Sequence, residues 1–364
     1  PPPALSGAPP GSPLRFECCT LRARARLLAR PPLCLHGVDE VRLDQVPQPE
    51  PGINDIVLQV SLCGICGSDL GYIAMGGLGM TQPMPLGHEL VGVVSATGAN
   101  VKQLAVGDRV VINPMAAGNS IGNGGSEGGF TPYLLVRNVA MEEKVALKVP
   151  ESLSDEQAAM IEPLSVALHG CHQGRIKPTD TAVVFGAGPI GLCTALCLGY
   201  LGLESIVVVD NSEFRLAAAK RIGAIPFKAG NGNLADFLTE QHGAARLMGS
   251  PVPATDVYLE ATGVKRVFDE IVGTAKTGAR VVVLGLHKQP VQLDLANLLL
   301  RELNITGSMA YPTEFPEVIA MLQSGRLDVS ALISHQFPLS QFEQGLHQAR
   351  NVDAAIKVMI DCQR

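Results

Sequence analysis

The feature that most constrains the fold is a glycine-rich turn between an apolar run and an apolar segment. The β-branched run Ala182–Phe185 is followed directly by residues 186–191, which include Gly186, Gly188, Pro189, Ile190 and Gly191. In a strand–turn–helix unit, the first glycine permits a tight turn, the second lets backbone approach a pyrophosphate, and the third allows close helix packing. The pattern predicts an α/β protein with a Rossmann domain, a doubly wound parallel sheet that binds a dinucleotide.

The next apolar run indicates which dinucleotide binds. Ser205–Val209 is followed by Asp210, about twenty residues beyond the glycines, where a carboxylate can accept hydrogen bonds from the adenosine ribose. A negative charge there repels a 2'-phosphate, which favours NAD over NADP, although Arg215 can partly offset it. The alternative is that the glycines only form a tight turn in a nucleotide-free domain.

Length and charge narrow the class of protein. The chain has 364 residues, more than one hydrophobic core usually serves, so two domains are expected. A net charge of -6 without a lysine-rich block argues against nucleic acid, and small molecules are the expected partners. Nine cysteines, scattered and odd in number, do not form a secreted disulfide framework, so a cytoplasmic location is expected.

Two segments raise the question of targeting. Thr181–Leu203 has no charged residue and is long enough to suggest a membrane span, but its glycines fit a strand, a turn and a buried helix better, so no membrane partner is expected. Residues 1–20 are rich in proline and small residues and predict a flexible tail, which includes Cys18 and Cys19. Four arginines between residues 22 and 30 faintly suggest an organelle-targeting segment.

The texture of the chain changes near Pro150. Before it, short β-branched runs such as Ile56–Val60 and Arg109–Ile112 predict an antiparallel, barrel-like domain. After it, Ser154 begins a helical stretch, and strands then alternate with helices. We expect a catalytic domain of residues 21–162 and 309–364 and a Rossmann domain of residues 163–308. The expected Rossmann strands are Ala182–Phe185, Ser205–Val209, Asp256–Glu260, Arg280–Leu284 and Asn304–Thr306, and the last part should hold a helix at Phe315–Gln323 and a strand at Ala355–Ile360.

A second set of residues carries metal chemistry. Cys66, His88, Glu89 and Glu162 together supply a thiolate, an imidazole and two carboxylates. Catalytic zinc takes three such protein ligands and leaves a position open for water or substrate. Cys63 and Cys66 also form a Cys-x-x-Cys pair, which can mark a structural zinc or a redox site, but no second pair accompanies it. We therefore interpret Cys66 as the ligand and Cys63 as a buried strand residue.

These motifs resemble the zinc-dependent medium-chain dehydrogenases, and most closely their polyol branch, which includes sorbitol and L-idonate dehydrogenases. The resemblance covers nearly everything after residue 21 and rests on several motifs in order: 64–69, 87–89, 106–110, 162–164, the glycine pattern, 260–263 and 301–302. It implies a GroES-like β-barrel catalytic domain and a homo-oligomer, either a dimer or a tetramer. It also implies Cys66, His88 and Glu89 as zinc ligands, with Glu162 as a fourth ligand or as the holder of the zinc-bound water.

The resemblance also implies roles for residues around the metal. Ser68 would relay a proton, Tyr72, Tyr311 and Arg301 would meet the substrate or orient polar groups, and the cofactor would contact Leu284, Gly285 and Leu286. The expected reaction passes a hydride from a secondary alcohol, such as a polyol, sugar acid or diol, to NAD and leaves a ketone. The alternatives are a non-catalytic NAD(H)-binding redox sensor and a zinc-free enzyme of the quinone-reductase type.

Two departures from these relatives affect the prediction. Many relatives carry a four-cysteine lobe for a structural zinc, whereas residues 113–129 contain no cysteine here, so we expect one catalytic zinc and no structural zinc. Ala310 stands where sorbitol dehydrogenases carry an arginine that meets the substrate, and Gly71 replaces a histidine often found before Tyr72. The identity of the alcohol therefore stays open.

Overall fold

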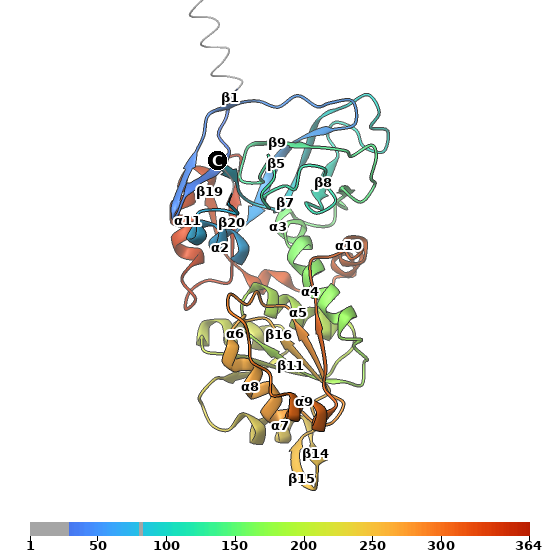
Figure 1. The fold of residues 1–364 in the computed structure, drawn as a ribbon. Coiled ribbons are helices and arrows are strands. Elements are labelled where there is room, and N and C mark those ends of the chain that lie inside the picture. Colours follow the sequence, from blue (N-terminus) through green and yellow to red (C-terminus); the bar gives the residue numbers. More distant parts are fainter. Residues whose placement is uncertain (1–28, 80–82) are drawn as a thin grey trace, which may run out of the picture.

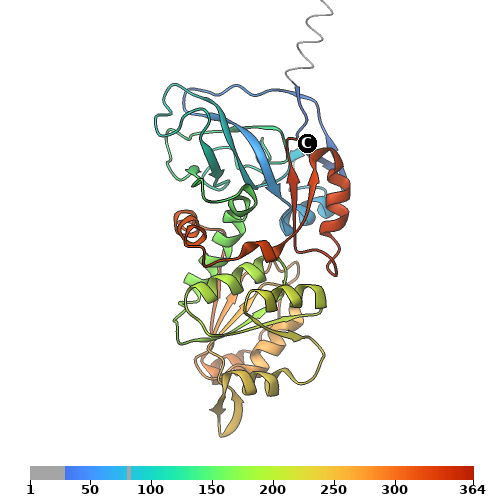
Figure 2. The same ribbon diagram turned by 180° about the vertical axis from the view of Figure 1, so that it is seen from behind.

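A computed structural model of the chain describes residues 29–79 and 83–364 and shows an elongated molecule of two parts (Figures 1 and 2). The predicted tail, Cys18, Cys19 and most of the arginine-bearing stretch lie outside the described residues. The upper part in Figure 1 contains the N-terminal strands and the C-terminal strand, and the lower part contains the strand–helix alternation. The helix α4 (Ile161–Gln173) lies where the two parts meet.

The lower part is a Rossmann domain, as the glycine pattern predicts. Its six strands are all parallel and run in the spatial order β13-β12-β11-β16-β17-β18. The strand order reverses between β11 and β16, and in such sheets the ligand crevice opens at the carboxyl ends of the strands at this point. The strands are β11 (Thr181–Phe185), β12 (Ser205–Asp210), β13 (Ile225–Lys228), β16 (Val257–Glu260), β17 (Arg280–Val283) and β18 (Asn304–Gly307).

Helices cover both faces of this sheet: α5 (Pro189–Tyr200), α6 (Glu213–Arg221), α7 (Leu234–His242), α8 (Lys265–Thr274) and α9 (Leu295–Arg301). Helix α5 is apolar all round because nearly all of it is buried between the sheet and α4. The uncharged segment 181–203 is thus a strand, a turn and a buried helix. In the part of the chain that the structure describes, no helix has the length and apolarity needed to cross a membrane.

The upper part is the GroES-like β-domain, built on a seven-stranded sheet. Its order is β10-β8-β7-β5-β20-β19, with β9 also paired to β5. Because β20 pairs with β5, the C-terminal segment returns to the first part of the chain. The strands are β5 (Ile56–Gly64), β7 (Glu89–Thr97), β8 (Arg109–Ile112), β9 (Tyr133–Val136), β10 (Ala146–Lys148), β19 (Ile333–Pro338) and β20 (Lys357–Asp361).

Smaller elements complete this part. Two small sheets pair β1 (Ala29–Arg30) with β4 (Val46–Pro47), and β2 (Leu33–Gly37) with β3 (Glu40–Leu43) and β6 (Met84–Pro85). The helices are α2 (Gly67–Met75), α3 (Asp155–Ala159), α10 (Phe315–Gln323) and α11 (Phe342–Ala349), with short 3-10 turns at Val329–Leu332 and Leu339–Gln341.

The predicted bounds of one helix are confirmed, and several strands of the Rossmann part were not predicted. Helix α10 begins and ends at the predicted residues, and Ser154 accepts a hydrogen bond from the backbone of Gln157 in a capping box that begins α3. The strand β13 and a hairpin of β14 (Ala244–Leu247) and β15 (Ser250–Pro253) were not predicted. The hairpin projects at the far end of the Rossmann domain (Figure 1), and its Pro251 and Pro253 obscure it in the sequence.

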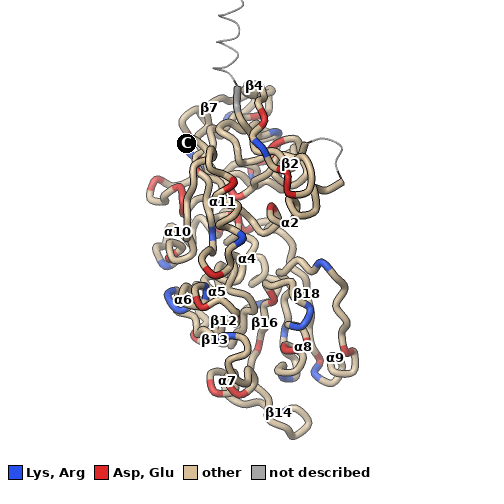
Figure 3. Tube along the Cα trace, turned by 90° about the vertical axis from the view of Figure 1, so that its left-hand side faces the viewer, with Lys and Arg blue, Asp and Glu red and all other residues tan. Residues whose placement is uncertain are grey.

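Charged residues lie mainly in loops and at helix ends. In Figure 3 acidic and basic residues are interspersed over both parts of the molecule rather than segregated. A few charged side chains are buried instead, and Glu89, Glu162 and Lys357 are among them.

Candidate active site

Cys66 lies at a corner between strand β5 and helix α2. The backbone N–H of Ile65 donates to Val358, which ties the end of β5 to β20, and Cys66 then serves as the N-cap of α2. The Cys66 N–H donates to Asp69 Oδ2 at 2.9 Å, which closes a capping box at this helix start. The sulfur of Cys66 is therefore held on a rigid turn.

His88 and Glu89 come from a second turn, which leads into β7. Gly87 has a φ of +93°, and a side chain there would overlap the ring of Phe130, so this position requires glycine. The buried Asp69 joins the two turns, because its Oδ1 accepts from Gly87 N–H at 3.2 Å and lies 3.7 Å from His88 Nδ1. Asp69 thus places a carboxylate next to the imidazole, on the side where carboxylates support metal-binding histidines. Sequence reasoning included Asp69 in a motif but assigned it no role.

The two turns bring three predicted ligands together. One ligand atom each from Cys66, His88 and Glu89 lies within 4.8 Å of the other two. Small side-chain rotations would bring these atoms onto the bonds of about 2.0–2.3 Å that zinc makes with sulfur, nitrogen and oxygen. The donor set therefore fits zinc.

Glu89 has a partner that sequence reasoning missed. Lys357, in β20, is almost completely buried, and its Nζ donates to both Glu89 oxygens, at 2.7 and 2.5 Å, and to Ile65 O at 3.1 Å. Gly64 makes room for this pair, because an added Cβ would lie 2.2 Å from Glu89 Oε2. No local pattern reveals Lys357, which is separated from Glu89 by most of the chain.

Glu162 lies at the start of α4 and is also buried. Its carboxylate contacts Tyr311, and burial together with the charge of Glu89 raises the pKa of Glu162 to about 7, although His88, Tyr311 and Lys357 oppose the shift. Burial alone would lower the pKa of His88, but the charges of Asp69, Cys66 and Glu162 raise it well above normal. The anionic groups around His88 in this buried cluster would be neutralised by a divalent cation.

Ser68 and Tyr72 of α2 lie beside the cluster. Ser68 Oγ is 3.4 Å from His88 Nε2, and the Tyr72 hydroxyl donates to Asn123 Oδ1 at 3.3 Å. Partial burial raises the pKa of Tyr72. Asn123 comes from the cysteine-free segment 113–129, so this segment contributes a polar group on the Tyr72 side.

The nucleotide crevice is formed by backbone. Gly186 has a φ of +99°, and a Cβ on Gly191 would lie 1.8 Å from Gly186 O, so α5 can pack this closely only because residue 191 has no side chain. Helix α5 begins at Pro189, with Gly188 as N-cap and Ile190 in its first turn, so its free N–H groups point into the crevice.

Asp210 and Arg215 border the same turn. Asp210 Oδ2 accepts from Ala187 N–H at 2.6 Å, and Oδ1 accepts from Ser212 N–H at 2.8 Å. Arg215 Nη1 would lie 3.7 Å from a Cβ on Gly188, and Arg215 Nε donates to Ala355 O at 3.0 Å in the other domain. Asp210 is therefore fixed at the crevice, and a cation lies close to the turn that would hold phosphates.

Residues 284–286 form the opposite wall. The N–H groups of Leu284 and Gly285 donate to Glu260 O, and Leu286 is 79% exposed. A second buried acid supports this wall: Glu260 Oε1 accepts from Gly263 N–H at 2.9 Å, and Oε2 contacts His287 Nε2 at 2.8 Å. Glu260 belongs to a motif that sequence reasoning noted without assigning a role.

We use the name metal cluster for the side chains of Cys66, His88, Glu89, Glu162 and Lys357. Arg301 does not lie at the metal cluster, and its predicted substrate role is wrong. It ends α9 at the amino ends of the Rossmann strands, the edge opposite the crevice. Its guanidinium is buried and donates to the carbonyls of Gly273 and Ala275, at the end of α8. Arg301 therefore anchors α9 to α8, whereas Tyr311 lies beside Glu162.

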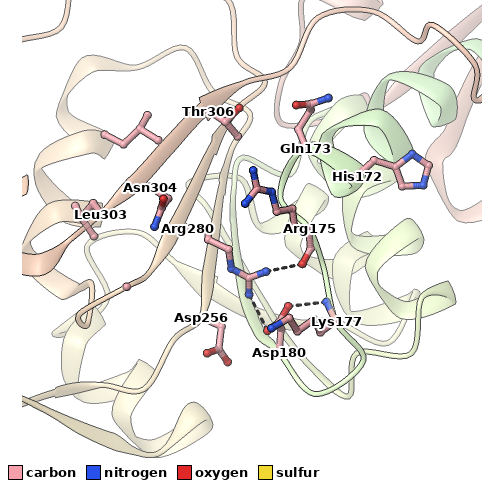
Figure 4. A pocket seen from close by; sticks show the side chains of 12 residues that line it. His172, Gln173, Arg175, Lys177, Asp180, Asp256, Arg280, Leu303, Asn304 and Thr306 are labelled. Carbon is pink, nitrogen blue, oxygen red and sulfur yellow. Dashed lines mark hydrogen bonds and ion pairs between the residues drawn. The ribbon is translucent and has the colours of Figure 1, made fainter.

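A cavity of about 810 Å³ lies at this same opposite edge (Figure 4). Its charged groups largely satisfy one another, because Arg280 pairs with Asp180 at 2.7 Å and donates to Arg175 O at 2.6 Å. It holds neither a metal-type cluster nor the glycine turn, so the buried anionic cluster is the better candidate active site.

Comparisons with known proteins agree with this geometry. Residues 52–151 match the family described as "Alcohol dehydrogenase GroES-like domain", and residues 189–324 match "Zinc-binding dehydrogenase". The chain is 33% identical to sorbitol dehydrogenase of Rattus norvegicus, over 91% of this chain and 95% of that one. It is 30% identical to L-idonate 5-dehydrogenase of Vitis vinifera, over 90% and 93%. It is also similar to the crystal structure of 2R,3R-butanediol dehydrogenase from Bacillus subtilis, with a TM-score of 0.81 and 26% identity over 91% and 99%.

The paired domains and the zinc-type donor set thus define a zinc-dependent dehydrogenase, and the chain belongs to the medium-chain alcohol and polyol dehydrogenase family. It is an oxidoreductase of this class, which oxidises an alcohol to a ketone with a nicotinamide cofactor. These findings favour the enzyme over the redox-sensor and quinone-reductase alternatives.

Proposed function

We propose that this chain oxidises a polyol, a sugar acid or a vicinal diol with NAD at one catalytic zinc held by Cys66, His88 and Glu89. Glu162 serves as a fourth ligand or holds the zinc-bound water. The observation that carries the proposal is the convergence of these three ligand atoms within 4.8 Å beside two further buried charges, Glu162 and Lys357. The names of the relatives, which include sorbitol, L-idonate and butanediol dehydrogenases, support the substrate class.

When bound, zinc held by Cys66, His88 and Glu89 would supply a Lewis acid that lowers the pKa of the substrate hydroxyl, and NAD would supply the hydride acceptor. Ser68 Oγ, close to His88 Nε2, takes the hydroxyl proton and passes it toward solvent. Lys357 and Asp69 hold Glu89 and His88 in place from behind. Tyr72 with Asn123 on one side, and Tyr311 with Glu162 on the other, orient the remaining polar groups of the substrate.

The Rossmann and barrel parts join beside this site. Ser212 Oγ donates to Val352 O at 3.0 Å, and Arg215 Nε donates to Ala355 O, two residues before Lys357. These contacts support hydride transfer across the junction, because they tie the start of α6, next to the crevice, to the segment that leads into the metal cluster.

Asp210 supports NAD as the cofactor, because a fixed carboxylate repels the 2'-phosphate of NADP. Replacing Asp210 with Asn should raise KM for NAD while improving use of NADP, so the ratio of the two kcat/KM values should fall by about tenfold or more. An unchanged ratio would contradict this assignment and would direct attention to Arg215.

The open edge of the Rossmann sheet supports a homodimer. Among the described residues, strand β18 is an edge of the Rossmann sheet, and Leu295 and Leu299 of the adjacent α9 are 70% and 72% exposed. Light scattering on the purified chain tests this assembly. A cytoplasmic location is proposed on a separate ground, the free thiols of Cys63, Cys66, Cys171, Cys193, Cys197 and Cys362.

The experiment that tests the function measures NADH formation with sorbitol, L-idonate, 2,3-butanediol and L-threonine, together with the zinc content of the same sample. We expect chelator-sensitive turnover of one substrate class and about one zinc per chain. Bound zinc without turnover would place the substrate outside this panel. No zinc even after reconstitution would refute the metal site.

A further inference from the structure

The segment from Ser308 to Thr313 carries the chain from the Rossmann domain to helix α10, and it is held at both ends of helix α4. At the start of α4, Glu162 contacts Tyr311 of this segment. Two helical turns later on the same face of α4, His169 contacts Glu314, the residue that precedes α10. The second contact lies outside the metal cluster, and no step of the proposed reaction uses it.

Glu314 is a buried carboxylate with an unusual number of partners. Its side chain is 3% exposed, and Oε1 lies 2.8 Å from His169 Nδ1 and 3.2 Å from His172 Nδ1. Oε2 accepts from the backbone N–H of Thr313 at 2.8 Å. Burial alone would raise the pKa of Glu314, but these hydrogen bonds outweigh burial and lower it, so the carboxylate is ionised near neutral pH.

Two further contacts around Glu314 and His169 are weaker. His172 also faces Glu317 Oε2 at 3.6 Å, but both of these side chains are substantially exposed. Gln173 Nε2 lies 3.5 Å from His169 Nε2. The His169–Glu314 contact therefore contributes most of the attachment, because it is the less exposed one, and exposed ion pairs are worth little.

We propose that Glu314, together with His169 and His172, is a clamp that positions the segment 308–313 so that Tyr311 meets Glu162 and the substrate. The inference rests on the proposed function for its substrate readout only. Tyr311 is 4% exposed and packs on Phe315 with ring centroids 5.1 Å apart, so a shift at the start of α10 moves Tyr311 directly. Glu314 is thus a positioning residue rather than a catalytic one.

Loosening the clamp should lower the fraction of molecules in which Tyr311 is in place. Apparent substrate affinity falls by that fraction, whereas saturating substrate restores the competent state. Glu314→Ala should therefore raise KM for the alcohol about tenfold and leave kcat within about threefold. Hydrogen exchange at residues 308–313 of the zinc-loaded full chain should accelerate by a similar factor, and zinc content and KM for NAD should not change.

Glu317→Ala is the matched control, because the same change three residues along α10 removes only an exposed contact. His169→Gln breaks the clamp from α4 and replaces Glu314→Ala if that variant does not fold. Glu314→Gln, which retains an acceptor oxygen, should restore part of the lost affinity. In a Tyr311→Phe background the KM effect of Glu314→Ala should largely disappear, because both changes remove the same contact.

Unchanged KM and unchanged exchange in Glu314→Ala would overturn the proposal, as would an undiminished effect in the Tyr311→Phe background. If the wild-type chain oxidises no alcohol of the panel, the proposed function fails separately. Hydrogen exchange then decides alone, because the clamp predicts faster exchange at 308–313 in Glu314→Ala and His169→Gln but not in Glu317→Ala.

Discussion

The metal cluster and the nucleotide turn are built in opposite ways. The cluster consists of charged side chains from four distant segments, ending with Lys357, which are buried together and serve as each other's counterions. The turn consists of backbone in one continuous strand–turn–helix, where the absence of side chains at Gly186 and Gly191 is what matters. A site made of charges should fail when one charge is removed, whereas a site made of backbone should fail when one methyl group is added.

The largest effect is expected at the metal cluster. Cys66→Ser should lower kcat/KM by about 10³-fold or more, because a zinc site with three protein ligands loses its thiolate. Turnover and zinc content measured on the same sample check this. Cys63→Ala is the matched control, since it removes the other thiol of the Cys-x-x-Cys pair from the buried side of β5. Equal zinc loss in both variants would show that Cys63 and Cys66 hold the zinc together, which would contradict the proposed ligand set.

Removing the cation behind Glu89 should destabilise the fold as well as the site. Lys357→Met leaves a buried carboxylate without its partner and should cost about 3–5 kcal/mol of unfolding free energy. Denaturant unfolding with and without chelator measures this cost. We expect zinc to reduce it, because the metal also neutralises Glu89, and Glu89→Gln in the Lys357→Met background should recover much of it. A cost independent of zinc would separate Glu89 from the metal.

At the nucleotide turn, we expect one added methyl group to be enough to disrupt the packing. Gly191→Ala places a Cβ against Gly186 O and should cost about 2–3 kcal/mol together with NAD affinity, because the backbone has to move. Thermal unfolding and NADH binding measure the two losses. Gly199→Ala, in the same helix, meets only an ordinary contact with Ile206 and should instead be neutral or slightly stabilising. Similar losses in both variants would refute the argument from close packing.

The smallest effect is expected at His242, a titratable residue of the Rossmann domain. Burial lowers the pKa of His242, in α7, to about 4, below its unfolded value near 6.5. The unfolded chain then binds the proton more readily, so this part of the stability is present above pH ~6.5 and is lost as the pH falls toward ~4. Because the ring is partly exposed, we expect on the order of 1 kcal/mol. Denaturant unfolding at several pH values should show a shallower acid loss in His242→Gln, and an equal loss would exclude His242 as the cause.

Elements formed by residues that are neighbours in the sequence were predictable, whereas sites formed by distant segments were less so. The bounds of α10 and the strands around the glycine turn follow from local periodicity and capping, which act over a few residues. The proposed ligand set could be named from the sequence only because several motifs occur together. Arg301 was misplaced because a motif position does not show which edge of the sheet its side chain reaches, and the β14–β15 hairpin was missed because prolines weaken its strand pattern.

The sequence by itself determined the two-domain class, the glycine turn and the candidate metal-ligating residues, because these depend on residue chemistry and short spacing. Only the tertiary structure decided that Asp69 lies beside His88, that Lys357 neutralises Glu89, and that Glu314 joins α10 to His169 of α4. Each of these contacts links segments separated by 19 to 268 residues. Coulombic and hydrogen-bond interactions of this kind depend on distance in space, which no local pattern encodes.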